Sequence, residues 1–126
     1  MKTITLIFTL LFTTQLLAEQ PMLRATPYKY VQSAIGKGKP HFIELGSDSC
    51  HSCKIMGKQL YRIKQKNPAF NIEFINVKRE REAAYAFKIR MIPTQIIYDA
   101  KGKEVYRHIG LLADKELKGL FSKYNF

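Results

Sequence analysis

The sequence holds only two cysteines, three positions apart, in the segment Cys50-His51-Ser52-Cys53. Two thiols at this spacing can close on each other as a disulfide and reopen. A bridge that closes so small a loop removes little entropy from the unfolded chain, so it would stabilise a fold poorly. The spacing therefore favours a redox-active pair over a static structural disulfide.

The stretch from Cys50 to Lys66 has apolar residues at near-helical spacing and stops at Asn67-Pro68, which predicts a helix with both cysteines in its first turn. The sulfur of Cys50 would face free backbone amides and the positive end of the helix dipole, and both favour a thiolate. Cys53, one turn deeper, can attack a mixed disulfide at Cys50 and release the reduced partner. We therefore predict that Cys50 is the nucleophile and Cys53 the resolving cysteine.

Zinc and covalently attached haem are the other common partners of a cysteine pair. Zinc needs about four ligands, and His41, His51 and His108 show no ligand spacing with the pair. Haem attachment needs a histidine directly after the second cysteine, where this chain has Lys54. We expect no metal and no organic cofactor, only the cysteine pair itself.

The rest of the chain predicts an α/β fold. Short apolar runs bounded by Gly, Pro or Asn indicate strands, and segments of helical periodicity alternate with them. This order contains crossovers and one hairpin, which implies a central mixed sheet of about four strands with helices on both faces. Thr26 and Asp114 precede two of the helices and are expected to cap them. The predicted helices span 27–35, 50–66, 80–87 and a closing segment after residue 114, and the predicted strands span 41–45, 72–77, 95–98 and 104–109.

The N-terminus has the pattern of a secretory signal peptide: a positive start, an apolar run over residues 4–17 and a small residue, Ala18. We therefore predict a signal peptide over residues 1–18 and one domain over residues 19–126, periplasmic or otherwise exported after cleavage. Leu16 is larger than the residue preferred three positions before a cleavage site, so retention as an N-terminal membrane anchor is the alternative.

The chain is strongly basic, with a formal net charge of +11. A charge of this size attracts nucleic acid, anionic lipid and acidic proteins alike. The basic residues run from Arg24 to Lys123 without an arginine-rich block or a nucleic-acid motif. We therefore expect no nucleic-acid binding and a basic, solvated surface.

Three segments resemble the thioredoxin superfamily, and together they cover nearly all of residues 26–124. They are Phe42-Ile43-Glu44 before the cysteines, Ile92-Pro93-Thr94 some forty residues after them, and Gly110 after the last strand. The resemblance implies a thioredoxin fold and thiol–disulfide oxidoreductase activity. It also implies a cis peptide bond before Pro93, with Ile92 and Pro93 as one wall of a substrate groove and Gly110 as another.

Glu44 stands six residues before Cys50, where the superfamily carries a buried acid. A carboxyl group buried beneath the cysteines would have a raised proton affinity and could exchange protons with Cys53 during turnover. The alternative is a salt-bridged strand residue without a catalytic role.

The two residues between the cysteines depart from the glycine–proline of the cytoplasmic reductants, and the chain has no tryptophan. We expect both residues, His51 and Ser52, to contact the substrate. A protonated His51 would stabilise the thiolate at Cys50 and make the disulfide a stronger oxidant.

These features favour an exported reductase that reduces disulfides in exported proteins and is itself reduced by a membrane-embedded electron donor. We expect it to be a monomer. Isoleucine before Pro93 resembles the reducing branch of the superfamily more than the oxidising one.

A dithiol oxidase or an isomerase is the alternative within the class. Oxidases of the superfamily usually carry a large helical insertion, for which residues 53–93 leave no room, and isomerases usually need a dimerisation domain. The alternative of another class is a non-catalytic adaptor, a thioredoxin fold whose basic surface binds an acidic partner.

Overall fold

Each predicted helix and strand is present in the computed structural model, which describes residues 18–126, with bounds that differ by a few residues. The predicted signal peptide lies outside these residues except for Ala18, and it stays a prediction. Across residues 18–126, no helix has the length and apolar character that crossing a membrane requires. The elements are α1 (Tyr28–Ala34), β1 (His41–Gly46), α2 (His51–Lys66), β2 (Ile72–Asn76), α3 (Arg81–Ala86), β3 (Thr94–Tyr98), β4 (Glu104–Ile109) and α4 (Asp114–Lys123).

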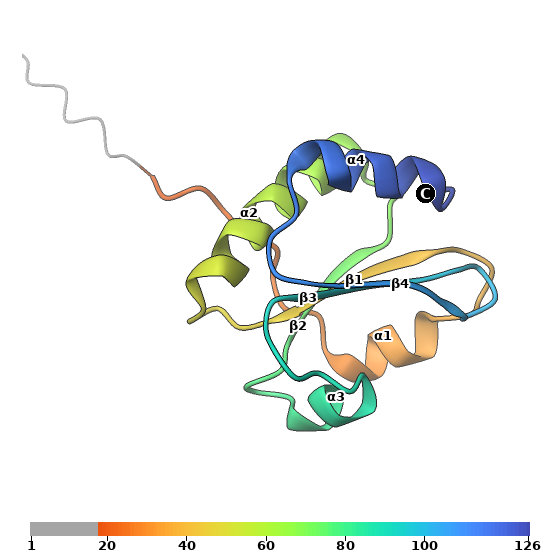
Figure 1. Cartoon of the computed structure of the whole chain (residues 1–126), viewed down its shortest axis with the longest axis horizontal. Helices are drawn as coiled ribbons and strands as arrows, with labels where there is room; N and C mark the ends of the chain where they lie inside the picture. Colours follow the sequence, from red (N-terminus) through yellow and green to blue (C-terminus); the bar gives the residue numbers. More distant parts are fainter. Residues whose placement is uncertain (1–17) are drawn as a thin grey trace, which may run out of the picture.

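The strands form one mixed sheet in the order β2-β1-β3-β4 (Figure 1). β1 runs parallel to β2, because the chain crosses over through α2 between them, and antiparallel to β3. β3 and β4 form an antiparallel hairpin through a turn in which the Gly102 amide donates to the Asp99 carbonyl at 3.0 Å. The predicted α/β fold with a central mixed sheet of four strands is confirmed.

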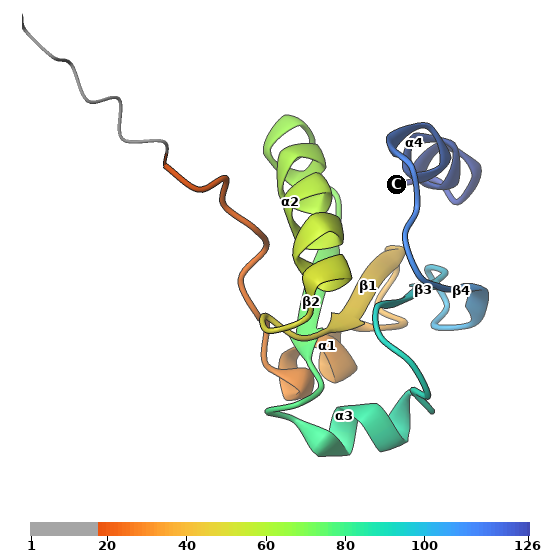
Figure 2. The same cartoon turned by 60° about the vertical axis from the view of Figure 1, so that its left-hand side comes forward.

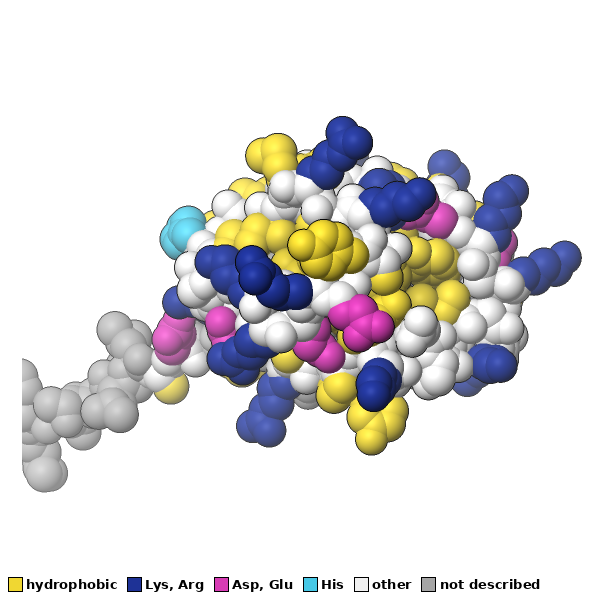
Figure 3. Space-filling model, turned by 90° about the horizontal axis from the view of Figure 1, so that it is seen from below, with side chains coloured by type: hydrophobic (Ala, Val, Ile, Leu, Met, Phe, Trp, Pro, Cys, Tyr) yellow, Lys and Arg dark blue, Asp and Glu magenta, His cyan; other side chains and the backbone are white. Residues whose placement is uncertain are grey.

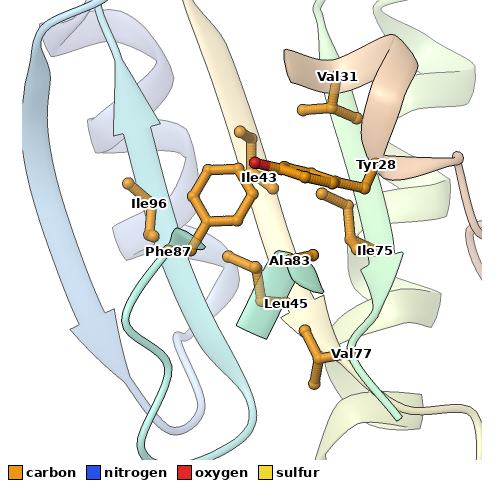
Figure 4. Close-up of a cluster of buried hydrophobic side chains, with 9 residues drawn as sticks. All are labelled: Tyr28, Val31, Ile43, Leu45, Ile75, Val77, Ala83, Phe87 and Ile96. Atoms are coloured by element: carbon orange, nitrogen blue, oxygen red, sulfur yellow. The ribbon is translucent and has the colours of Figure 1, made fainter. Parts of the chain in front are cut away.

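Helices cover both faces of the sheet: α2 and α4 lie on one face, and α1 and α3 lie on the other (Figures 1 and 2). Each face buries its own apolar cluster. Under α1 and α3, side chains from β1, β2 and β3 meet those of the two helices (Figure 4). This cluster consists of Tyr28, Val31, Ile43, Leu45, Ile75, Val77, Ala83, Phe87 and Ile96.

The second cluster lies under α2 and α4 and consists of Phe42, Met56, Leu60, Ile72, Ile97, Leu112, Leu117 and Phe121. β1 is a central strand covered on both faces, so all six of its residues are buried. Side chains alternate along a strand, so Phe42, Glu44 and Gly46 share the face that α2 covers. The fold thereby places a carboxylic acid in the interior beneath α2.

The residues that precede α1 belong to the packed domain. Met22 contacts Gly57 of α2, and the Leu23 amide donates to the Gly57 carbonyl at 3.1 Å. Ala25 then forms a parallel bridge with Phe74 at the outer edge of β2. This segment therefore covers part of one sheet edge and supports the outer side of α2.

The prediction that Thr26 caps the first helix is wrong. Pro27 occupies the cap position and has no side-chain hydrogen bond to offer. The free amide of Tyr28 donates instead to both carboxylate oxygens of Glu80, at 2.9 and 3.1 Å. A residue 52 positions away thus accepts the hydrogen bond of the free amide at the start of α1 and links this helix to the loop before α3.

The closing helix also begins differently from the prediction. Ala113 is its cap residue, and Asp114 is the first residue of the helix. The Ala113 amide donates to the carboxylate of Glu116 at 2.8 Å, while the Asp114 carboxylate accepts from the Gln59 side chain of α2 at 3.0 Å. Asp114 therefore links the two helices on this face.

The packing predicts unequal costs for two substitutions in α2. Leu60 is fully buried in the cluster under α2 and α4, so Leu60→Ala is expected to lower the free energy of unfolding by about 2–5 kcal/mol. Ile55, on the same helix, is 37% exposed, and Ile55→Ala serves as the matched control with a cost of about 1 kcal/mol or less. Urea unfolding of both variants measures the difference, and equal costs would contradict this packing.

Candidate functional site

The two cysteines occupy different environments at the start of α2. Cys50 is the cap residue, with extended backbone, and its sulfur accepts a hydrogen bond from the Cys53 amide at 3.4 Å. Its side chain is partly exposed, whereas Cys53 is fully buried. Cys50 is thus the sulfur that a partner disulfide can reach, and Cys53 lies one turn below it.

The Cys53 thiol holds its proton strongly. Burial raises the pKa of Cys53 to about 12, and the hydrogen bond with Cys50 adds to this effect, while a backbone hydrogen bond at Ser47 opposes it. Both sulfurs are free thiols in the structure. Cys53 needs a proton acceptor before it can act as a nucleophile near neutral pH.

The end of β1 lies directly against the deeper sulfur. A Cβ atom at Gly46 would lie 2.8 Å from the Cys53 sulfur and 3.1 Å from its Cβ, closer than packed side chains approach. Glycine is therefore required here by the position of α2, which could not keep its place over a larger residue. The sequence analysis used Gly46 only as a strand boundary and missed this role, although its place at the end of a buried strand was a usable signal.

Glu44 lies two residues before Gly46 on the same face of β1 and is fully buried. Burial raises the pKa of Glu44 well above its ordinary value; the nearby Gln95 amide opposes the rise, and the charge of Cys50 adds to it. Among residues 18–126, neither carboxyl oxygen forms an ion pair. The salt-bridged alternative for Glu44 therefore finds no partner in the described part of the chain.

The sheet brings Pro93 and Gly110 to the end where the cysteines lie. Leu45 pairs with Thr94, so Pro93 stands beside the end of β1. The peptide bond between Ile92 and Pro93 is cis. The Gly110 amide donates to the Pro93 carbonyl at 2.9 Å, and the φ of Gly110, +103°, lies in the region that favours glycine. Backbone from two separate segments therefore meets at this end of the sheet.

Large apolar side chains surround these backbone segments without being buried. Met91 is 63% exposed next to Ile92, while Ile109 and Leu111 are 49% and 48% exposed on either side of Gly110. These three residues were not among the site residues predicted from the sequence. Their positions beside Pro93 and Gly110 were the available signal, since an exposed apolar group at such a place suits a protein partner.

The residues between the cysteines face outward. His51, the first residue of α2, is exposed, and Ser52 is partly exposed. Both lie close to the reachable sulfur in sequence and in space, as a substrate contact would require. Whether they touch a substrate stays a prediction.

Basic side chains hold the loop that leads into α2. Lys78 donates to the Ser49 hydroxyl at 3.1 Å, and Arg79 pairs with Asp48 at 2.8 Å. The Ser49 hydroxyl also bonds that of Ser47 at 2.9 Å. The loop after β2 thereby fixes the approach to Cys50, a link between distant segments that no local pattern in the sequence indicates.

No group of three or more His, Cys, Asp or Glu side chains in residues 18–126 is arranged to hold a metal ion. His41 pairs instead with Glu73 at 2.9 Å, and the His108 ring contacts the Leu111 carbonyl at 3.2 Å.

Comparison with known proteins identifies this arrangement. A model of the thioredoxin-like domain family matches residues 28–125, which includes the cysteine pair, Pro93 and Gly110. The chain belongs to this family. It is 27% identical over 81 residues to thioredoxin from Mycoplasma pneumoniae, which covers 64% of this chain and 78% of that protein. A second thioredoxin, from Mycoplasmoides gallisepticum, is 27% identical over 86 residues, 68% of this chain and 85% of that protein.

Solved structures show the same fold. A thioredoxin variant from Halobacterium salinarum superposes with a TM-score of 0.71 at 19% identity, over 82% of this chain and 90% of that one. Thioredoxin from Fasciola hepatica gives a TM-score of 0.64 at 20% identity, over 76% and 88%. The predicted thioredoxin fold is confirmed, and the chain is a thioredoxin-like thiol–disulfide oxidoreductase with a Cys50–Cys53 pair.

The buried carboxyl group predicts a particular pH dependence of stability. An unfolded chain releases the Glu44 proton near pH 4.3, whereas the folded chain, with its raised pKa, keeps it. Stability therefore falls as the pH rises from about 4.3 through the folded-state pKa, because the unfolded state binds fewer protons there. Glu44→Gln removes this loss, so it is expected to raise the free energy of unfolding more at pH 8 than at pH 4.

Urea unfolding at the two pH values measures this gain, with Glu82→Gln, which removes an exposed carboxylate, as the matched control. A stability difference between wild type and Glu44→Gln that is the same at pH 4 and pH 8 would contradict the buried, protonated state.

Proposed function

We propose that the chain is an exported disulfide reductase that transfers two electrons from the Cys50–Cys53 dithiol to disulfides in exported proteins. The observation that carries this proposal is the pairing of a reachable sulfur with a buried one: Cys50 is partly exposed at the start of α2, and Cys53 is fully buried one turn below. This arrangement suits attack on a large partner followed by internal resolution.

In the first step, the Cys50 thiolate attacks one sulfur of the substrate disulfide. A bond forms between Cys50 and that sulfur, the substrate S–S bond breaks, and the other substrate sulfur leaves as a thiolate that takes up a proton. The Cys53 amide in the first turn of α2 donates to the attacking sulfur at 3.4 Å, and the positive end of the helix dipole favours its negative charge.

In the second step, Cys53 attacks the Cys50 sulfur, closes the Cys50–Cys53 disulfide and releases the second substrate thiol. The Cys53 proton must leave first, and Glu44 is the acceptor we assign, since its carboxyl group lies beneath α2 and is electrostatically coupled to Cys53. Glu44 can take up this proton only as a carboxylate, so it must first release its own proton to solvent. The raised pKa of Glu44 brings its proton affinity closer to that of the thiol, which makes the transfer less unfavourable. Two electrons have then passed to the substrate.

The substrate is held by the end of the sheet. Ile92 and Pro93 form one wall of the proposed groove and Gly110 the other, with the exposed side chains of Met91 and Leu111 as apolar contacts. His51 and Ser52 complete the rim next to the reachable sulfur.

Two features support the reducing direction over the oxidase or isomerase alternative. Isoleucine precedes Pro93, as in the reducing branch. The His51 side chain is exposed, so water and salt would screen a positive charge there and limit how far it could stabilise a thiolate at Cys50 and make the pair a strong oxidant. A reductase outside the cytoplasm needs a supply of electrons, and a membrane-embedded dithiol donor fits the predicted export of residues 19–126.

Replacement of the resolving cysteine tests the assigned order of attack. Cys53→Ser is expected to accumulate a mixed disulfide between Cys50 and a disulfide-bonded protein substrate, because nothing can resolve it, and turnover should fall to the uncatalysed rate. Cys50→Ser, the matched control, should form no such adduct because Cys53 is buried. Non-reducing electrophoresis with mass spectrometry identifies the adducts.

An adduct through Cys53 in the Cys50→Ser variant would reverse the two roles. Unchanged binding of a partner when both cysteines are serine, together with no adduct in either single variant, would support the non-catalytic adaptor instead.

A further inference from the structure

A second feature adjoins the proposed substrate groove, on the α3 side of the hairpin. Here the loop between α3 and β3 and the outer strand β4 enclose a cleft of about 270 Å³. The cleft is lined by Lys88, Arg90, Thr94, Glu104, Arg107 and Ile109, and we call it the basic cleft.

The cleft carries unbalanced positive charge. Its single acid, Glu104, accepts from the Arg107 guanidinium at 2.8 Å, and Arg107 also donates to the Phe87 carbonyl at 2.9 Å. Lys88 and Arg90 are exposed, and within residues 18–126 neither forms an ion pair. Two cationic groups therefore face this cleft without a counter-charge from the described part of the chain.

Lys88 is held in an unfavourable backbone conformation. Its φ of 54° lies in the left-handed region, which glycine adopts at little cost and a lysine adopts with strain. The position ends α3, where the Ile89 amide bonds the Ala84 carbonyl at 2.8 Å, and glycine is the usual residue at such helix ends. A side chain kept at a strained position next to a site points to a use for that side chain.

The basic cleft is continuous with the groove. Thr94 follows Pro93 directly, and its partner across the hairpin, Ile109, precedes Gly110. Two residues of the cleft wall thus adjoin the two backbone walls of the groove. An extended substrate strand that lies along Pro93 and Gly110 therefore runs beside the cleft wall and advances about 3.3 Å with each residue.

We propose that the basic cleft binds acidic side chains of the protein substrate, so that the enzyme prefers disulfides flanked by Asp or Glu within a few residues of the attacked cysteine. This proposal rests on the proposed reductase function and assigns its substrate class. Lys88 and Arg90 are the specificity residues, while Arg107 shapes the cleft through its bonds to Glu104 and Phe87.

The probe is a pair of synthetic disulfide-bonded peptides that differ only in Glu or Gln at positions two to four from the attacked cysteine. The reduced full chain is mixed with each peptide, and the second-order rate constant for its oxidation is measured at low and high salt. The Glu peptide is expected to react about five- to tenfold faster at low salt, as two surface ion pairs, with Lys88 and Arg90, would provide. High salt should reduce this preference.

A matched pair of double variants separates the cleft from the general field of a basic protein. Lys88→Gln with Arg90→Gln is expected to abolish the preference for the Glu peptide and leave the rate with the Gln peptide unchanged. Lys115→Gln with Lys118→Gln removes the same charge from two exposed positions of α4, on the other face of the sheet, and this control should keep the preference (Figure 2). Figure 3 shows basic side chains spread over the α3 side, so this control is needed.

Lys88→Gly tests the contribution of the strained residue by itself. This variant is expected to melt at a higher temperature than wild type, since glycine relieves the strain, and to lose part of the preference. A preference unchanged in Lys88→Gly, or lost equally in both double variants, would overturn the assignment of the basic cleft. Equal rates for the two peptides in wild type would overturn it and leave the reductase intact, whereas failure to reduce either peptide would overturn the proposed function as well.

Discussion

The contact between Cys53 and the end of β1 is the constraint on which the site depends. No side chain fits between Gly46 and the Cys53 sulfur, so α2 can sit directly on the last residue of the central strand. This seats the deeper cysteine in the interior and leaves Cys50 at the surface. The same strand end pairs with Thr94, the first residue of β3, which follows Pro93 directly, and the hairpin returns Gly110 to Pro93. The close approach of α2 to Gly46 thus brings together four parts of the chain: the end of β1, the start of α2, Pro93 and Gly110.

The same constraint explains why a carboxylic acid is tolerated in the core. Glu44 shares a face of β1 with Gly46, so the seating of α2 that buries Cys53 also buries the acid beneath it. Burial raises the pKa of both groups, and a charge on Glu44 makes loss of the Cys53 proton harder still. Burial of Glu44 lowers the stability of the fold and also raises the proton affinity of its carboxyl group towards that of the Cys53 thiol. We therefore assign Glu44 to the resolution step.

The sequence was sufficient for the elements and for the two cysteines, because both depend on local patterns. Apolar periodicity placed the helices and strands, and the cysteine spacing with Ile92-Pro93-Thr94 pointed to the fold. What could not be predicted depends on residues far apart in the chain. Glu80 caps α1 in place of Thr26, Lys78 holds the loop before Cys50, and the need for glycine at position 46 exists only once α2 has been placed.

The reduction potential of the Cys50–Cys53 couple tests the central claim, that this dithiol donates electrons, most directly. Equilibration of the protein with glutathione or dithiothreitol buffers of known poise gives the value. The account predicts a potential close to that of a reducing thioredoxin, about −270 mV. A potential near −120 mV, the range of a strong oxidant, would contradict it and make the chain a source of disulfides, since the gap corresponds to about 7 kcal/mol for two electrons.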